Sequence, residues 1–175
     1  MQKTFHYDSP YWTDKNTYGL PEGETGLDHD ETKLPTYWNT PFTKICLGMK
    51  IPGEDTRFLV QNVNASSLYA LIADGKHRPT PLGRQEWKTL IGSQASLQLN
   101  CNREGFNVMS DDRAYSKARI GYVANQENEC IRGNSRIGFG TGGHQRDSDT
   151  CGNEATHSAD NGDKHIQAMG YILVQ

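Results

Sequence analysis

The chain has 175 residues, of which 34% are hydrophobic and 22% charged, and its net charge at pH 7 is -3. This length favours a single domain, residues 1–175. Acidic and basic residues are intermixed, which excludes the basic footprint of a nucleic-acid-binding protein. No stretch approaches the roughly 20 apolar residues of a membrane-spanning helix.

Residues 1–45 are rich in aromatic residues and turn signals, and residues 26–32 read as an acidic, solvent-exposed loop. Apolar residues then alternate at positions 45, 47, 49 and 51, which predicts a half-buried strand over 42–51. A turn at Pro52-Gly53 separates it from a second β-rich run over 57–63. Together these segments predict a hairpin.

Residues 66–75 fit either a strand or one short helix, because apolar residues at 68, 71 and 72 have helical spacing. Residues 83–91, which contain Trp87, are the better helix candidate. Alternating patterns predict strands over 96–101, 118–123 and 165–174. The elements therefore predict a mostly β (α+β) fold with one or two short helices: a compact, loop-rich antiparallel β-sheet domain.

Four cysteines, Cys46, Cys101, Cys130 and Cys151, form no CxxC pair, which disfavours structural zinc. An even count fits two disulfides in a secreted, extracellular protein, and the alternative is four reduced thiols in the cytosol. Three pairings are open. We favour Cys46–Cys101 and Cys130–Cys151, since sequential pairing keeps each bridge within its own subregion. The sequon Asn64-Ala65-Ser66 agrees with secretion.

The segment from 135 to 165 is rich in glycine and in hard oxygen ligands, which calcium prefers. The candidate calcium ligands are Asp147, Asp149, Glu154, Asp160 and Asp163. Their spacing differs from an EF-hand loop, because Cys151 stands where an oxygen ligand is expected. A solvent-exposed acidic loop with glycine turns is an equally weighted alternative. Candidate ligand-binding residues in the same segment are His144, Asn153, Glu154 and His157.

Catalytic motifs are missing from the sequence. The glycine run over 138–143 has neither the GxGxxG order nor the Lys-Ser/Thr of a P-loop, and the histidines lack the i, i+4 spacing of a zincin. There is no GxSxG elbow. No pair of carboxylates stands out for glycoside hydrolysis. We therefore predict a binding protein and not an enzyme.

Three stretches, 40–49, 135–143 and 151–175, carry a resemblance to a known domain. They resemble a domain of cnidarian extracellular proteins, including skeletal organic matrix proteins of corals, over about residues 12–175. That domain is distantly similar to fibrinogen-related and intelectin-like lectin domains. The resemblance implies secretion, disulfides, ligand recognition and calcium near the C-terminal region, and it assigns no ligand position in this chain.

The favoured hypothesis is a secreted, calcium-assisted carbohydrate-binding module whose partner is a glycan or glycoprotein. The alternative is a structural or adhesive matrix protein that self-associates, for which a homo-oligomer is expected. A net charge of only -3 disfavours strong mineral binding. A hydrolase is the third and least favoured hypothesis.

Overall fold

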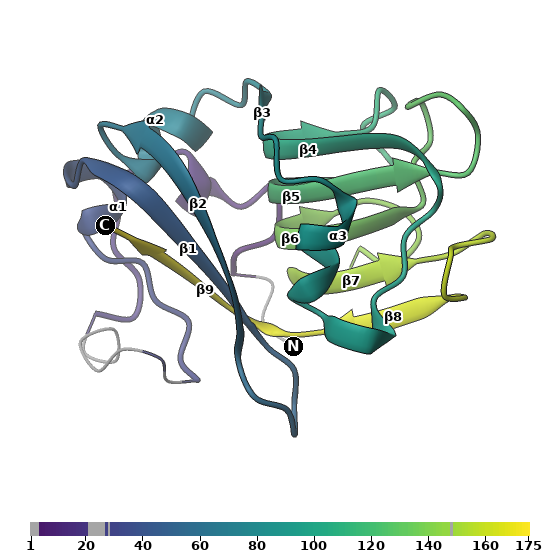
Figure 1. Ribbon diagram of the computed structural model, residues 1–175. Helices are drawn as coiled ribbons and strands as arrows, with labels where there is room; N and C mark the ends of the chain where they lie inside the picture. Colours follow the sequence, from purple (N-terminus) through teal and green to yellow (C-terminus); the bar gives the residue numbers. More distant parts are fainter. Residues whose placement is uncertain (1–3, 21–26, 28, 148) are drawn as a thin grey trace.

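The computed structural model describes residues 4–20, 27, 29–147 and 149–175. It contains a three-stranded antiparallel sheet, in the order β2-β1-β9, and a six-stranded antiparallel sheet, in the order β3-β4-β5-β6-β7-β8 (Figure 1). The predicted mostly β class with short helices is confirmed. Within the described residues, no helix is long and apolar enough to cross a membrane.

The bounds of the strands are β1 (Phe42–Lys50), β2 (Arg57–Ala65), β3 (Arg78–Pro79), β4 (Asn100–Met109), β5 (Lys117–Asn125), β6 (Ser135–Gly142), β7 (Cys151–Ala155), β8 (Lys164–Gln167) and β9 (Met169–Val174). The α-helices are α1 (Thr36–Asn39), α2 (Leu68–Ile72) and α3 (Arg84–Thr89), and the 3-10 helices are η1 (Pro10–Trp12) and η3 (Gly92–Gln94).

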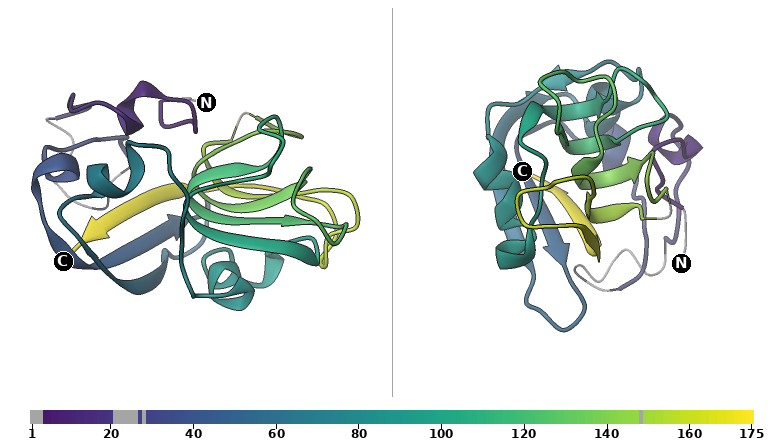
Figure 2. Two further views of the ribbon diagram at one scale, coloured as in Figure 1. Left: turned by 90° about the horizontal axis from the view of Figure 1, so that it is seen from above. Right: turned by 90° about the vertical axis from the view of Figure 1, so that its right-hand side faces the viewer.

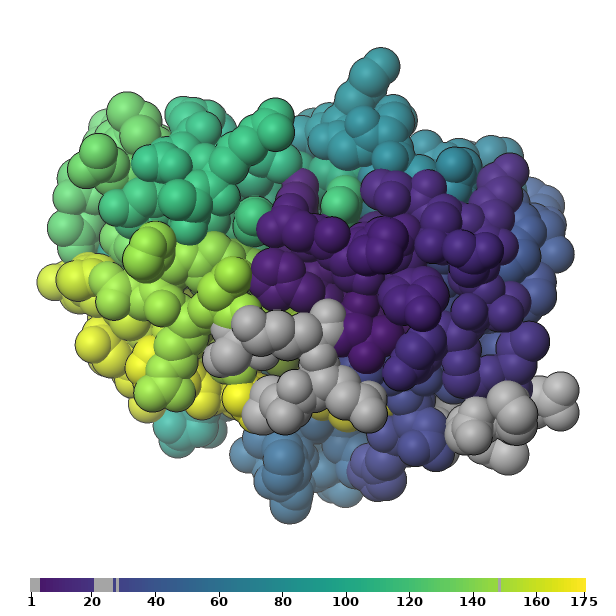
Figure 3. Space-filling model, turned by 180° about the vertical axis from the view of Figure 1, so that it is seen from behind, coloured from purple at the N-terminus to yellow at the C-terminus, as the bar shows by residue number. Residues whose placement is uncertain are grey.

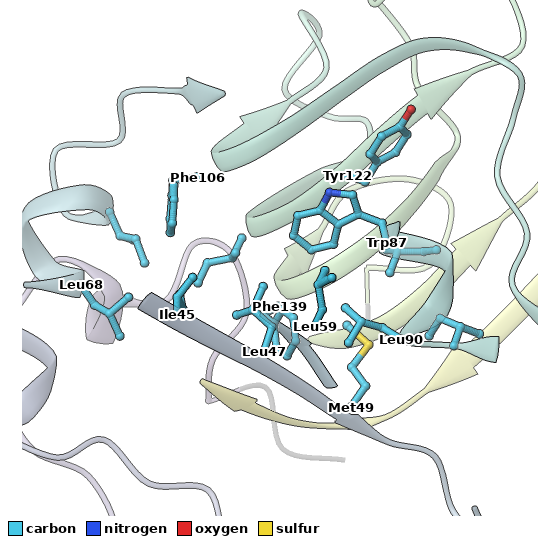
Figure 4. Close-up of a cluster of buried hydrophobic side chains, with 14 of the residues drawn as sticks. Ile45, Leu47, Met49, Leu59, Leu68, Trp87, Leu90, Phe106, Tyr122 and Phe139 are labelled. Atoms are coloured by element: carbon cyan, nitrogen blue, oxygen red, sulfur yellow. The ribbon is translucent and has the colours of Figure 1, made fainter. Parts of the chain in front are cut away.

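The predicted hairpin is confirmed as β1 and β2, which pair antiparallel. Ile45, Leu47 and Met49 of β1 are buried, as their alternation predicts. Figure 4 shows these side chains facing Trp87 and Phe139, so one apolar core joins the two sheets. Burial of this shared core is the main favourable contribution to folding.

Helices form at both predicted segments. Ser67 caps α2, because its Oγ accepts the N–H of Ala70 at 3.1 Å. Trp87 of α3 is completely buried, and its indole Nε1 donates to Glu104 Oε2 of β4 at 2.7 Å. This hydrogen bond satisfies the only polar group of the indole and fastens α3 to one face of the six-stranded sheet.

The strand predicted over 96–101 begins later, since β4 starts at Asn100. Among the described residues, 96–98 belong to no helix or strand. Their backbone amides donate to side chains instead: Ser96 N to Asn153 Oδ1, Leu97 N to Asp160 Oδ1 and Gln98 N to Ser135 Oγ. Side chains from distant segments thus replace the strand-to-strand backbone hydrogen bonds that the alternating pattern predicted.

The glycine-rich run after Ser135 is a strand, β6, and every residue of it is buried. The expectation that these glycines serve turns in a loop is therefore wrong for 135–142. Gly138 lies opposite Gly121 of β5, and a Cβ on Gly138 would fall 2.5 Å from the carbonyl oxygen of Ile120. Glycine is needed here because side chains and backbone of β5 approach too closely for any other residue.

The C-terminal pattern predicted one strand, yet the chain forms two strands that belong to different sheets (Figure 1). Ala168 lies between β8 and β9, and its N–H donates to the carbonyl oxygen of Cys151. A Cβ on Gly170 would meet Cys151 Sγ at 2.7 Å, so glycine permits this close crossing. The consecutive strands β8 and β9 therefore connect the two sheets.

The predicted disulfide pairing is wrong. Cys101 and Cys130 form the bridge, with a Cα–Cα distance of 5.0 Å, and Cys46 and Cys151 are free thiols. Cys46 lies in the middle strand of the three-stranded sheet, whereas Cys151 packs into the core beside Gly170. Sequence order could not reveal that β4 and the β5–β6 connection meet at one end of the six-stranded sheet.

The N-terminal segment lies across the back of the molecule (purple in Figure 3). Trp12 is buried there, and its Nε1 donates to the carbonyl oxygen of His6 at 3.0 Å. The guanidinium of Arg119 from β5 stacks 4.3 Å from the ring centre of Tyr7. The hydrogen bond of Trp12 holds the segment together, and the contact between Arg119 and Tyr7 attaches it to the six-stranded sheet.

Candidate functional site

The structure distributes the predicted calcium ligands over separate places. Asp147 Oδ1 accepts the N–H of Gly143 and contacts His6 Nε2 at 2.7 Å. Asp160 is paired with Lys88 Nζ at 2.9 Å and with Arg84 at 3.2 Å. Both carboxylates therefore already hold cationic or N–H partners from the protein.

The remaining three predicted ligands are also apart. Asp149 Oδ1 accepts from Gln167 Nε2, Glu154 lies in the buried interior of the six-stranded sheet, and Asp163 is exposed in the β7–β8 turn. Asp149 lines an open pocket of about 480 Å³ together with Asp30 and Glu31. In the described ranges, no three His, Cys, Asp or Glu residues are grouped to hold a metal ion. Calcium binding stays a prediction.

A second concave site lies where four connections of the six-stranded sheet meet: β4–β5, β5–β6, β6–β7 and β7–β8. We call it the loop pocket. It measures about 440 Å³ and is lined by Tyr115, Glu127, Glu129, Ile131, Arg132, Asn134, Gln145 and His157. Figure 2 shows, on the left, that α3 lies on one side of the six-stranded sheet. The pocket combines one aromatic ring with amide, carboxylate, guanidinium and imidazole groups.

The floor of the loop pocket is fixed by the β5–β6 connection, residues 126–134. The Cys101–Cys130 disulfide ties this connection to the start of β4. Within it, the Glu129 carboxylate accepts from Asn125 Nδ2 and from the N–H of Ile131, each at 2.6 Å. Charge-assisted hydrogen bonds of this kind are short and hold the turn in one conformation.

Tyr115 reaches the pocket because the β4–β5 connection folds back onto the β5–β6 connection. The backbone amides of Asp111 and Asp112 donate to the carbonyl oxygens of Cys130 and Ile131, both at 2.9 Å. The Tyr115 ring is thereby placed 5.9 Å from the Arg132 guanidinium. Two consecutive connections thus build one wall of the pocket.

Gln98 positions two pocket residues from below. Its side chain is completely buried. Its Nε2 donates to the carbonyl oxygen of His157, and its Oε1 accepts the N–H of Asn134, both at 2.9 Å. His157 itself has φ of 54°, so this hydrogen bond helps hold a backbone conformation that histidine adopts rarely.

The turn that carries His144 and Gln145 is held by Arg136 of β6. The Arg136 guanidinium is 1% exposed and donates to the carbonyl oxygens of His144 at 3.0 Å and Arg146 at 2.5 Å. Burial lowers the pKa of Arg136, and the nearby carboxylates, with Glu154 foremost, oppose that shift. A buried cation thus anchors the rim of the pocket.

Glu154 supplies the main countercharge. It is the cross-strand neighbour of Arg136 on β6 and of His165 on β8, and its Oε1 lies 2.6 Å from His165 Nδ1. Burial raises the pKa of Glu154, while His165 and Arg136 act in the opposite direction. The three residues form a row of ionisable side chains across the sheet, beneath the 144–146 turn.

The predicted ligand-binding residues divide into two pairs. His157 lines the loop pocket, and the ring of His144 packs against Tyr115 with centroids 5.6 Å apart. Asn153 and Glu154 lie in the sheet instead, where Asn153 donates to the carbonyl oxygens of Ser96 and Arg136. The structure therefore brings the two histidines near one pocket and gives the other two residues roles in the scaffold.

Most pocket residues were missed by sequence reasoning, among them Tyr115, Arg132, Asn134 and Gln145. They come from three connections without a motif, and only the fold brings them together. The one usable signal was that polar residues follow segments in which apolar and polar positions alternate. Such residues are candidates because binding residues often lie on loops held by a rigid sheet.

The pocket has groups available for a ligand. Asn134 is buried, and its Oδ1 has no hydrogen-bond partner among the described residues. Arg132 is exposed and makes no ion pair within the part of the chain that the structure describes. Its guanidinium can donate several hydrogen bonds in one plane. Together with the Tyr115 ring, these groups can hold a polar ligand with one apolar face.

Comparison with protein-family models, curated proteins and solved structures found no match for this chain. The geometry of the loop pocket therefore carries the functional interpretation.

Proposed function

We propose that this protein is a secreted recognition domain that binds carbohydrate in the loop pocket. The observation that carries the proposal is the Tyr115 ring standing in an open pocket beside amide, carboxylate and guanidinium groups. A sugar ring has an apolar C–H face that packs on an aromatic ring, and hydroxyls that both donate and accept hydrogen bonds. The lining offers partners for both features.

Recognition without turnover is supported by the role of Glu129, one of the two carboxylates that line the pocket. Both oxygens of Glu129 accept hydrogen bonds from Asn125 and Ile131, so this residue holds the loop. A glycosidase needs one carboxyl that can give up a proton and a second that acts as base or nucleophile. Secretion is supported by the Cys101–Cys130 disulfide, because such bridges persist in oxidising compartments.

The proposal includes a calcium ion that helps to hold the sugar, and experiment decides whether it is needed. A glycan array probed with calcium and with excess EDTA separates two modes. Retention that chelation abolishes supports a bound calcium ion that helps to hold the sugar. Retention that survives EDTA supports direct hydrogen bonds from the pocket and ends the calcium mechanism. No retained glycan in either buffer contradicts carbohydrate binding.

Replacing Tyr115 with alanine is expected to weaken glycan binding by up to about tenfold, since aromatic packing contributes about 0.5 to 1.5 kcal/mol. Tyr115→Phe keeps the ring and is expected to bind within about twofold of the wild type. Isothermal titration calorimetry with a glycan selected on the array measures both affinities.

Two arginine variants give a second test of the pocket with a matched control. Arg132→Ala removes the pocket guanidinium, whereas Arg113→Ala changes an exposed arginine of the β4–β5 connection that does not line the pocket. Loss of binding in Arg132→Ala but not in Arg113→Ala supports the loop pocket. Equal binding by all four variants would place the sugar elsewhere on the molecule.

A further inference from the structure

The outward face of the three-stranded sheet exposes apolar side chains. Phe58 and Val60 of β2 are 46% and 58% exposed, and Leu173 of β9 is 45% exposed. Val60 and Leu173 are the cross-strand neighbours of Cys46 on the middle strand. Contiguous exposed apolar residues on an outer strand favour association between chains.

The same strand carries the one Asn-x-Ser/Thr sequon of the sequence, at Asn64-Ala65-Ser66. Exposure alternates along β2, with residues 58, 60, 62 and 64 on the exposed side. Asn64 lies at a shift in the β1–β2 register, next to the last paired residue, Ala65. Its side chain is therefore accessible, and β2 is an outer strand of its sheet.

We infer that Asn64 is a site of N-linked glycosylation and that its glycan shields the outward face of β2. The donor is a lipid-pyrophosphate-linked oligosaccharide of the secretory pathway. Asn64 Nδ2 forms the bond to the anomeric carbon and loses one proton, and the bond from that carbon to the lipid pyrophosphate breaks. The inference rests on the proposed secretion and is independent of sugar binding in the loop pocket.

Distance along the strand supports the shielding role. Asn64 is four residues from Val60 on the same exposed side, which is about 13 Å at the rise of a β-strand. A branched glycan spans such a distance and places a hydrated surface over the apolar residues. Asn64 has no side-chain hydrogen bond within the described residues that attachment would break.

The test is expression of the chain through the secretory pathway of a eukaryotic cell, followed by peptide mass spectrometry. We expect the peptide containing Asn64 to carry a hexose-rich mass increase, and a peptide N-glycosidase, which hydrolyses the amide bond between asparagine and the first sugar, to remove it. Asn64→Gln and Ser66→Ala are expected to abolish the modification. Asn62→Gln, on the same face but outside the sequon, is expected to retain it.

Light scattering then tests shielding. Asn64→Gln and Ser66→Ala are expected to self-associate at a severalfold lower concentration than the wild type, and Phe58→Ser added to Asn64→Gln is expected to reverse this change. Secreted, disulfide-bonded protein with an unmodified Asn64 would overturn the inference. Modified protein whose association is unchanged by glycan removal would overturn the shielding role.

Discussion

Replacing Arg136 with methionine is expected to lower the free energy of unfolding by about 3 kcal/mol near neutral pH. Methionine has a similar volume, but it leaves the carbonyl oxygens of His144 and Arg146 without their buried donor. It also leaves Glu154 without its cationic neighbour in the sheet. Urea denaturation followed by circular dichroism measures the change.

Two further variants separate these contributions. Arg103→Met removes a half-exposed ion pair with Asp111 on the same face of the sheet and is expected to cost less than about 1 kcal/mol. Adding Glu154→Met to Arg136→Met removes the unpaired carboxylate and is expected to recover part of the loss. A double variant no more stable than Arg136→Met would show that Glu154 does not depend on Arg136.

The deficit of Arg136→Met is expected to shrink as the pH falls. Burial already raises the pKa of Glu154, and loss of the opposing cation raises it further. A carboxyl whose folded pKa exceeds its unfolded pKa contributes most stability below the unfolded value, about 4.3, and this contribution is lost as pH rises through the folded pKa. Unfolding curves at several pH values check the trend; a deficit that grows toward acid pH would contradict it.

Removing the Cys101–Cys130 disulfide by a double alanine substitution is expected to cost about 3 to 4 kcal/mol, because the bridge closes a loop with a sequence separation of 29. The bridge also ties the floor of the loop pocket to β4, so glycan binding is expected to fall together with stability. Cys46→Ser, which changes a free thiol, is the matched control and is expected to cost less than about 1 kcal/mol.

Peptide mapping under non-reducing conditions gives an independent test of the pairing. The observed fold requires a crosslinked peptide containing Cys101 and Cys130, and alkylation of Cys46 in the folded protein, where it is partly exposed. A crosslink between Cys46 and Cys101 would contradict the strand arrangement, because those residues belong to different sheets.

Local patterns predicted the elements whose faces differ in burial. The β1–β2 hairpin was found because Ile45, Leu47 and Met49 alternate with exposed or smaller residues. Strand β6 was missed because it is buried on both faces and uses glycine where β5 approaches closely. Periodicity has no signal for such a strand, and glycine content then points to turns.

Long-range features lay beyond local patterns. The division of residues 164–174 into β8 and β9 depends on the crossing at Gly170, and the disulfide depends on which segments meet at one end of a sheet. The loop pocket was anticipated only through His144 and His157. Asn153 and Glu154 carry the hydrogen-bonding groups typical of a ligand-binding site. In the fold, however, those groups pair with residues of the neighbouring strands β6 and β8.

Chemical-shift mapping tests sugar binding in the loop pocket most directly. The isotope-labelled protein is titrated with a glycan retained on the array, and backbone amide shifts are followed to saturation. We predict that the largest changes lie at Tyr115, Arg132, Asn134 and His157, with little change around Asp149 and Gln167. Changes concentrated around Asp149, or none at saturating sugar, would contradict the proposed site.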